Sequence, residues 1–296
     1  MPGRALVTGS EGFTGQYVCQ ELQSAGWEVW GTGIRPSPSS DQYIPCELVD
    51  PQQVEALIAR VQPDLVIHLA AIAFVAHGDP SAFYQVNVIG TRNLLASLAA
   101  SDHKPSCVIL ASSANIYGNR TEGALNEATP PDPANDYALS KLAMEYMAKL
   151  WTQQLPIVIT RPFNYTGVGQ DQNFLIPKVV QHFKNRSQVI ELGNLDVGRD
   201  FSDVRDVARA YVALATQCPA GETVNLCSGR SYALRDVLLL ASELSGHELT
   251  IEINPAFVRS NEVRNLRGDR SRLEALAGYW EPISLAETIE WMLSNS

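Results

Sequence analysis

The chain has 296 residues, of which 45% are hydrophobic and 18% are charged, a composition typical of a globular protein with a sizeable buried core. Its net charge of −10 argues against a surface that binds nucleic acid or an anionic membrane. The 5 cysteines form no Cys-x-x-Cys pair and have no histidine at metal-site spacing, which predicts free thiols and no metal.

The first residues, Met1 to Arg4, lead straight into an apolar run, so we expect no signal peptide. No apolar run reaches the length of a membrane-spanning helix. We therefore expect a cytoplasmic protein with partners other than nucleic acid or membrane. Free thiols agree with a reducing compartment.

The first motif lies between a short apolar run, Ala5–Thr8, and a helix predicted from Gln16. Three glycines separate the two in the spacing Gly-x-x-Gly-x-x-Gly, which is typical of a turn that binds a dinucleotide pyrophosphate. The first glycine permits the tight turn, the second lets backbone approach phosphate, and the third lets helix pack on strand. A glycine-rich turn without a ligand is the competing interpretation, and the position between strand and helix argues against it. The predicted cofactor residues here are Gly9, Gly12, Phe13, Thr14 and Gly15.

The second predicted strand, Glu28–Thr32, ends where the adenosine ribose lies in a dinucleotide fold. A carboxylate there would accept from the 2′-hydroxyl of NAD. This chain instead has Arg35, which favours a 2′-phosphate and therefore NADP(H), with NAD(H) as the alternative. Arg35 could equally be an ordinary loop arginine.

Strands and helices alternate five times before residue 112, which predicts an α/β fold with a doubly wound parallel sheet of the Rossmann type. The strand at 64–71 is continuously apolar, as in a strand buried on both faces. His68 within it is therefore predicted to be a hydrogen-bonded core residue. The other predicted elements are strands at 43–48 and 107–111 and helices at 50–61 and 83–101.

The predicted catalytic group is Ser113, Tyr137 and Lys141. Tyr137 and Lys141 are four residues apart at the start of a predicted helix and so share one face. The ammonium would lower the pKa of the phenol and prepare it for proton transfer. Ser113 adds a hydroxyl at the end of a strand. A surface tyrosine and lysine are the competing interpretation, which the glycine motif makes weak.

The chain resembles the extended short-chain dehydrogenase/reductases, a family of NAD-dependent nucleotide-sugar epimerases, dehydratases and reductases. The resemblance implies further cofactor contacts from Glu47, Leu48, Leu69, Ala70 and Ala71, and it also places Tyr137 and Lys141 at the cofactor. It runs almost end to end through these segments: 8–15, 68–71, Asn87 with 90–91, 112–113 with 117–118, 137–141, 161–164, 198–201 with 204–207, and 224–226.

The second half is similar to the branch that contains GDP-mannose 4,6-dehydratase and the GDP-4-keto-6-deoxymannose reductases. Segments 161–170, 193–196, 225–229 and 259–263 carry this likeness. Arginine forks suit a diphosphate in an acidic protein, although each could be a structural ion-pair partner. The resemblance implies a sugar-nucleotide pocket lined by Asn164, Lys178, Arg199, Arg259 and Glu262.

The sequence differs from the 4,6-dehydratases at one position that bears on the reaction. The 4,6-dehydratases have an acid two positions after the catalytic Ser or Thr, where this chain has Asn115. An amide cannot serve as a base at neutral pH, so dehydration is disfavoured.

We therefore expect NAD(P)H-dependent reduction of C4 in a nucleotide-linked 4-keto-6-deoxyhexose. A GDP-linked sugar, as in GDP-rhamnose synthesis, is favoured, and a dTDP-linked sugar is the alternative. In this reaction Tyr137 would donate the proton, Ser113 would bind the carbonyl oxygen, and Lys141 would bind the nicotinamide ribose. A 4-epimerase with tightly bound NAD and a cofactor-sensing protein without catalysis are the alternatives.

The same comparison implies a division of the chain into two domains. Residues 1–163, with a return segment near 199–229, would bind the dinucleotide. Residues 164–198 and 230–296 would form a smaller α/β domain for the sugar nucleotide. The resemblance also implies a homodimer through helices near 92–100 and 137–150, whose apolar spacing ordinary core packing explains equally well.

Overall fold

The computed structural model describes residues 3–36, 41–73, 79–119, 123–257 and 265–295. Its main feature is a seven-stranded parallel sheet with the strand order β11-β7-β5-β4-β1-β2-β3. The order reverses direction between β1 and β4, which confirms the doubly wound sheet. The strands are β1 (Arg4–Thr8), β2 (Glu28–Gly33), β3 (Tyr43–Pro45), β4 (Leu65–His68), β5 (Cys107–Ala111), β7 (Ile157–Pro162) and β11 (Thr223–Leu226).

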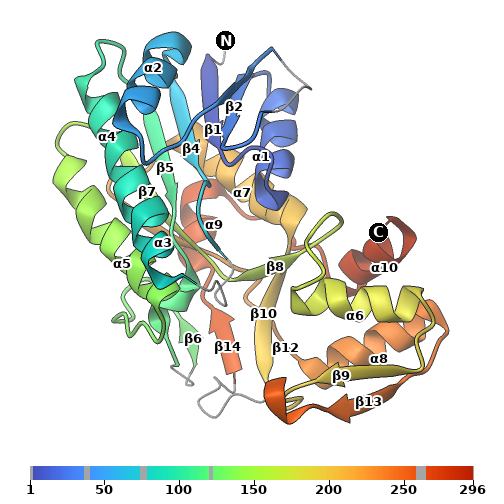
Figure 1. Ribbon diagram of the computed structural model, residues 1–296. Helices are drawn as coiled ribbons and strands as arrows, with labels where there is room; N and C mark the ends of the chain where they lie inside the picture. Colours follow the sequence, from blue (N-terminus) through green and yellow to red (C-terminus); the bar gives the residue numbers. More distant parts are fainter. Residues whose placement is uncertain (1–2, 37–40, 74–78, 120–122, 258–264, 296) are drawn as a thin grey trace.

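Helices cover both faces of this sheet (Figure 1). The strands are apolar on both sides, so alternate residues enter different cores. In β1, for example, Ala5 and Val7 pack toward one helical layer and Leu6 toward the other. One layer is α1 (Phe13–Ser24), α7 (Val204–Gln217) and α9 (Ser271–Ala277), and the other is α2 (Pro51–Val61), α4 (Thr91–Ala100) and α5 (Asp136–Ala148).

Several predicted boundaries differ from the structure. Helix α1 starts at Phe13 and not at Gln16, because Gly12 already has the extended conformation of an N-cap. Strand β4 ends at His68 and not at residue 71, because β1, its neighbour, turns into the glycine loop after Thr8. Strand β3 likewise ends at Pro45. The predicted helix 83–101 is divided into α3 (Pro80–Tyr84), the π-helix η1 (Gln85–Gly90) and α4.

Most of the remaining elements form a smaller part toward the lower right of Figure 1, and β6 lies at the lower left, below α5. The sheet of the smaller part has the order β12-β10-β14-β6, with β8 paired to β10, and a separate ladder joins β13 to β9. Helices α6, α8 and α10 share one apolar core with this part. Its elements are β6 (Ala124–Leu125), β8 (Asn164–Thr166), α6 (Leu175–Lys184), β9 (Val189–Leu192), β10 (Gly198–Asp203), β12 (Ser231–Ala233), α8 (Leu234–Ser245), β13 (Thr250–Ile253), η4 (Pro255–Phe257), β14 (Asn265–Gly268) and α10 (Leu285–Asn295).

The chain passes between the two parts more than once. After β10 in the smaller sheet, α7 and β11 return to the seven-stranded sheet, where β11 pairs with β7. Two short 3-10 helices, η2 (Ala114–Tyr117) and η3 (Lys149–Trp151), follow β5 and α5. Within the described ranges, no helix combines the length and apolar character needed to cross a membrane.

Candidate active site

The turn between β1 and α1 has a geometry that requires glycine at two positions. Gly9 has a φ of 70°, and a Cβ there would lie 2.9 Å from the amide nitrogen of Ala70. A Cβ on Gly15 would lie 2.2 Å from the carbonyl oxygen of Gly9. Helix α1 has no side-chain cap and no acidic residue in its first turn, which suits an anion at its N-terminus. The residues of this turn therefore fit a dinucleotide pyrophosphate.

The other predicted cofactor residues follow the carboxyl ends of neighbouring parallel strands and so lie along the same edge of the sheet. Arg35 follows β2 with an exposed side chain, and its carbonyl accepts a 2.6 Å hydrogen bond from Tyr43 Oη. Leu48, after β3, is buried, and its carbonyl accepts from Asn93 Nδ2 at 3.0 Å. Glu47 beside it is half-buried, as are Leu69, Ala70 and Ala71 after β4.

Asn87, in the π-helix η1, ties this edge to helix α5. Its Oδ1 accepts from the amide of Ile72 at 3.0 Å, and its Nδ2 donates to Ser140 Oγ at 3.0 Å. Ser140 in turn donates to the carbonyl of Tyr137 at 2.7 Å. This largely buried chain of bonds fixes α5 relative to the loop after β4. π-Helical turns are frequent at functional sites.

His68 is confirmed as a hydrogen-bonded core residue. Thr8 Oγ1 donates to its Nδ1 at 2.7 Å, and its Nε2 donates to Thr91 Oγ1 at 2.8 Å. Thr91 itself donates to the carbonyl of Asn87 at 2.7 Å, which assigns the proton to Nε2. Burial, with a smaller contribution from the charge of Lys141, lowers the pKa of His68 to about 3.

This depressed pKa predicts acid sensitivity of the fold. The unfolded chain binds a proton at His68 near pH 6.5, and the folded chain does so only near pH 3, so the free energy of unfolding falls as pH falls through this window. We expect a loss of about 2 kcal/mol between pH 6.5 and 5. Urea unfolding at both values should show this loss in the wild type and not in His68→Gln. The α6 variant His182→Gln is the control, and an equal loss in His68→Gln would contradict the assignment.

The structure brings Ser113, Tyr137 and Lys141 together. Ser113 follows β5 and caps η2, and Tyr137 lies in the first turn of α5, which Asn135 caps with a 2.9 Å bond to the amide of Ala138. Ser113 lies close enough to Tyr137 for hydrogen bonding from its hydroxyl to lower the pKa of the phenol in part. Lys141 Nζ donates to the carbonyl of Ala111 at 2.7 Å, at the end of β5. All three catalytic candidates are buried.

The electrostatics of this group differ from the expectation. Burial raises the pKa of Tyr137 to about 12; the bond from Ser113 lowers it in part and Tyr165 raises it further. Burial also lowers the pKa of Lys141 to about 8, against an opposing effect of Glu145. The prediction that Lys141 lowers the Tyr137 pKa is therefore wrong for this structure, because desolvation of the phenol outweighs any attraction to the ammonium.

Tyr165, at the centre of β8, is a contact that sequence reasoning missed. Its hydroxyl lies 2.7 Å from Thr14 Oγ1, and its ring stacks on Phe13 with centroids 6.0 Å apart. Tyr17, one turn further along α1, donates to the carbonyl of Val168 at 2.8 Å. These bonds join the glycine turn to the smaller part of the protein. The sequence signal was the position of Tyr165 inside segment 161–170, which carries the likeness to the GDP-sugar branch.

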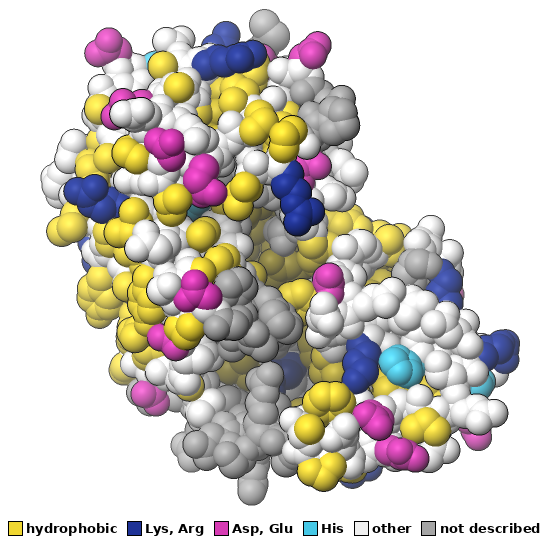
Figure 2. Space-filling model, in the orientation of Figure 1, with side chains coloured by type: hydrophobic (Ala, Val, Ile, Leu, Met, Phe, Trp, Pro, Cys, Tyr) yellow, Lys and Arg dark blue, Asp and Glu magenta, His cyan; other side chains and the backbone are white. Residues whose placement is uncertain are grey.

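Three of the predicted substrate residues, Asn164, Lys178 and Arg199, lie on the smaller part. Figure 2 shows the surface hollowed between this part and the part built on the seven-stranded sheet. Asn164, in β8, is exposed. The ammonium of Lys178, on α6, donates to the carbonyl of Glu191 at 2.8 Å and lies over the ring of Phe257 in a cation–π contact. Arg199, in β10, donates to the carbonyl of Gly198 at 2.8 Å. Arg259 and Glu262 lie outside the described residues, and the roles of all five stay predictions.

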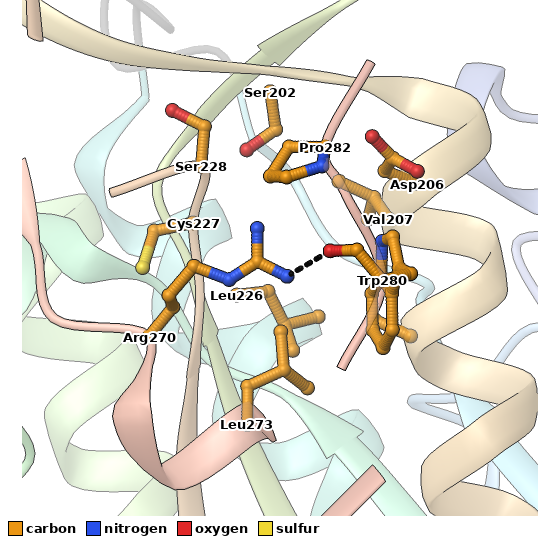
Figure 3. A pocket seen from close by; sticks show the side chains of 11 residues that line it. Ser202, Asp206, Val207, Leu226, Cys227, Ser228, Arg270, Leu273, Trp280 and Pro282 are labelled. Carbon is orange, nitrogen blue, oxygen red and sulfur yellow. Dashed lines mark hydrogen bonds between the residues drawn. The ribbon is translucent and has the colours of Figure 1, made fainter. Parts of the chain in front are cut away.

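A separate cavity lies among β10, α7, β11 and α9 (Figure 3). It measures about 10 Å³, which is room for about one water molecule and too small for a substrate. Arg270 donates to the carbonyl of Trp280 across it at 3.2 Å. None of the predicted site residues lines it; its wall includes Ser202, Asp206, Cys227 and Ser228. Among the described residues no cluster of His, Cys, Asp or Glu could hold a metal ion.

Known proteins resemble this chain over its whole length. The NAD dependent epimerase/dehydratase family matches residues 5–227. A GDP-6-deoxy-D-talose 4-dehydrogenase from Aggregatibacter actinomycetemcomitans is 35% identical, with 99% of this chain and 97% of the relative covered. A GDP-6-deoxy-D-mannose reductase from Pseudomonas aeruginosa is 34% identical, with 100% of this chain and 97% of the relative covered.

Two solved structures extend these comparisons. The structure of RMD from Pseudomonas aeruginosa complexed with NADPH has a TM-score of 0.87 and 32% sequence identity to this chain. The match covers 100% of this chain and 97% of the RMD chain. A crystal structure from Burkholderia cenocepacia J2315, provisionally named an epimerase, has a TM-score of 0.94 and 51% identity. This match covers 99% of this chain and 98% of the Burkholderia cenocepacia chain.

Proposed function

Since the chain belongs to the NAD dependent epimerase/dehydratase family, we propose that it reduces the C4 keto group of a GDP-linked 4-keto-6-deoxyhexose with NADPH. The two curated relatives are named for GDP-6-deoxyhexoses of the talose and mannose series, sugars that differ in configuration at C4. Oxidation at C4 converts both into the same 4-keto sugar. C4 oxidation and reduction is therefore the chemistry that the two names share.

One observation carries the proposal: Ser113, Tyr137 and Lys141 lie together at the carboxyl edge of the sheet, and Asn115 stands two positions after Ser113, where a dehydratase has an acid. Bound NADPH would supply the hydride. Tyr137, whose pKa is raised to about 12, is a protonated phenol at neutral pH and can donate its proton to the C4 oxygen. Ser113 would donate a hydrogen bond to the same oxygen, and Lys141 would hold the nicotinamide ribose.

The second candidate is a nucleotide-sugar 4-epimerase, which the provisional name of the Burkholderia cenocepacia structure favours. An epimerase must first remove a proton from a C4 hydroxyl, and a phenol with a pKa of about 12 is a poor base in the resting protein. An intact group of Ser113, Tyr137 and Lys141 argues against a binding protein without catalysis.

The proposed reaction can be tested by following NADPH absorbance with GDP-4-keto-6-deoxymannose, beside dTDP-4-keto-6-deoxyglucose and NADH as comparisons. We expect stoichiometric loss of NADPH with the GDP sugar, after which NMR of the product gives the configuration at C4. Copurifying NAD with interconversion of an intact UDP- or GDP-hexose, and no loss of NADPH with either keto sugar, would favour the epimerase. We further propose that the enzyme is cytoplasmic, which its free cysteines support.

Arg35 should set the preference for NADPH. Its exposed side chain follows β2, where the 2′-phosphate of the adenosine would lie, and guanidinium groups bind phosphate through charge-assisted hydrogen bonds. We expect Arg35→Ala to raise the KM for NADPH about tenfold and leave the KM for NADH unchanged, since one such bond contributes roughly 1.5 kcal/mol. Arg60→Ala, at another exposed arginine, is the control. Equal changes for both cofactors would contradict the role.

We propose that a second copy of this chain covers helix α5. Leu139, Tyr146 and Leu150 are 45%, 58% and 76% exposed, and their spacing of seven and four residues places them along one side of α5 and η3. Light scattering after size exclusion should give the mass of a dimer for the wild type. Leu150→Glu should shift the protein to monomer, because a charge in an apolar interface is costly. A monomeric wild type would refute the dimer.

A further inference from the structure

The hydroxyl oxygen of Ser113 receives two hydrogen bonds from one neighbour. The backbone N–H of Asn115 donates to Ser113 Oγ at 3.2 Å, and the side-chain Nδ2 of Asn115 donates to the same atom at 3.2 Å. The first bond is the ordinary cap of the 3-10 helix η2. The second depends on the side chain at position 115, which is exposed while Ser113 is buried.

These two bonds determine what Ser113 can do. A serine hydroxyl has one hydrogen and two acceptor lone pairs. Asn115 occupies both lone pairs, so Ser113 has only its hydrogen left to offer. That hydrogen can point toward Tyr137, the neighbour whose phenol pKa Ser113 lowers in part. In the reaction proposed above, the same hydrogen would meet the C4 oxygen that Tyr137 protonates.

We propose that Asn115 is a positioning residue that orients the Ser113 hydroxyl as a hydrogen-bond donor toward the reacting C4 oxygen. The inference rests on the proposed reductase function and assigns a role to the residue that replaces the dehydratase acid. An ionised carboxylate here would accept from Ser113 instead and turn the hydrogen away from the substrate. An amide at this position therefore favours binding of a carbonyl oxygen.

The test compares Asn115→Asp with Asn115→Ala. Aspartate has the shape of asparagine, so a role in packing alone would make it the milder change. The proposal requires the opposite order, because aspartate captures the Ser113 hydrogen whereas alanine leaves it free. We expect kcat with GDP-4-keto-6-deoxymannose to fall about 50-fold in Asn115→Asp and about fivefold in Asn115→Ala, with the KM for NADPH unchanged.

A double-mutant cycle with Ser113→Ala separates orientation from charge, because a new carboxylate also repels the negative charge that develops on the C4 oxygen. If Asn115 acts through Ser113, adding Asn115→Asp to Ser113→Ala should lower kcat less than about threefold. A full loss in that background would assign the effect to charge and overturn the inference. Asn185→Asp, exposed at the end of α6, repeats the charge change elsewhere as a control.

The remaining outcomes also decide the question. A wild type that does not reduce the keto sugar would overturn the proposed function, and this inference with it. A reducing wild type with Asn115→Asp as active as Asn115→Ala, or more active, would overturn this inference alone. That result would mean that the amide oxygen, and not its nitrogen, faces Ser113.

Discussion

Replacing Tyr137 by phenylalanine is expected to lower kcat by about 10³-fold and to leave NADPH binding intact, since general acid catalysis contributes factors of this size. The phenol is the buried proton donor beside Ser113, and phenylalanine keeps the ring but removes the proton. Steady-state turnover with the GDP-linked keto sugar measures the loss. Quenching of intrinsic fluorescence by NADPH measures binding.

Tyr146→Phe provides the matched control on the same helix, because Tyr146 is 58% exposed. Its kcat should equal that of the wild type. If Tyr137→Phe kept more than a tenth of the wild-type kcat, the proton would have to come from another group. If the variant kept its biological effect in the cell while turnover was lost, a cofactor-sensing role would replace the enzymatic one.

The second large effect is expected at Arg161, in β7. Its Nε and Nη2 donate to the two carboxylate oxygens of Glu145 on α5 at 2.9 and 2.7 Å, and Nη1 donates to Tyr117 Oη at 3.0 Å. Tyr117 Oη in turn donates a hydrogen bond to Asn225 Oδ1 at 2.7 Å. Arg161 and Glu145 are only 9% and 4% exposed. This network anchors the helix that carries Tyr137 and Lys141 to the strands behind it.

Arg161→Met should therefore lower the free energy of unfolding by about 3–5 kcal/mol, because it leaves the carboxylate of Glu145 buried without its cation. Urea unfolding at pH 7 measures the change. The double variant Arg161→Met/Glu145→Met should recover most of the loss, since an apolar pair often replaces a buried ion pair without net destabilisation. A loss below about 1 kcal/mol in Arg161→Met, or no recovery in the double variant, would contradict a desolvated pair.

The fold could be predicted from the sequence because its signals are local. The apolar strands alternate with helices, and the glycine turn needs a positive φ at Gly9 and a missing side chain at Gly15 whatever lies around it. His68 could be placed in the core from its apolar neighbours alone. Helix and strand ends were less accurate. Strand β4 ends at His68 because its neighbour β1 ends at Thr8, and α1 begins at Phe13 because Gly12 is already an extended N-cap.

The domain boundaries stay predictions, as do the roles of the individual site residues. The sequence also placed Ser113, Tyr137 and Lys141 at the ends of elements that parallel topology brings to one edge. Their mutual distances and their protonation depend on contacts between segments far apart in the chain.

Only the tertiary structure showed that Tyr137 has a raised pKa, that Tyr165 reaches Thr14 across 151 residues, and that Lys141 donates to the carbonyl of Ala111. Spacing along a helix predicted an ammonium near a phenol, but it could not weigh that attraction against desolvation. Burial is a property of the assembled core. The sequence therefore determined which chemical groups meet at the site, and the packing around them decided which of these groups hold a proton.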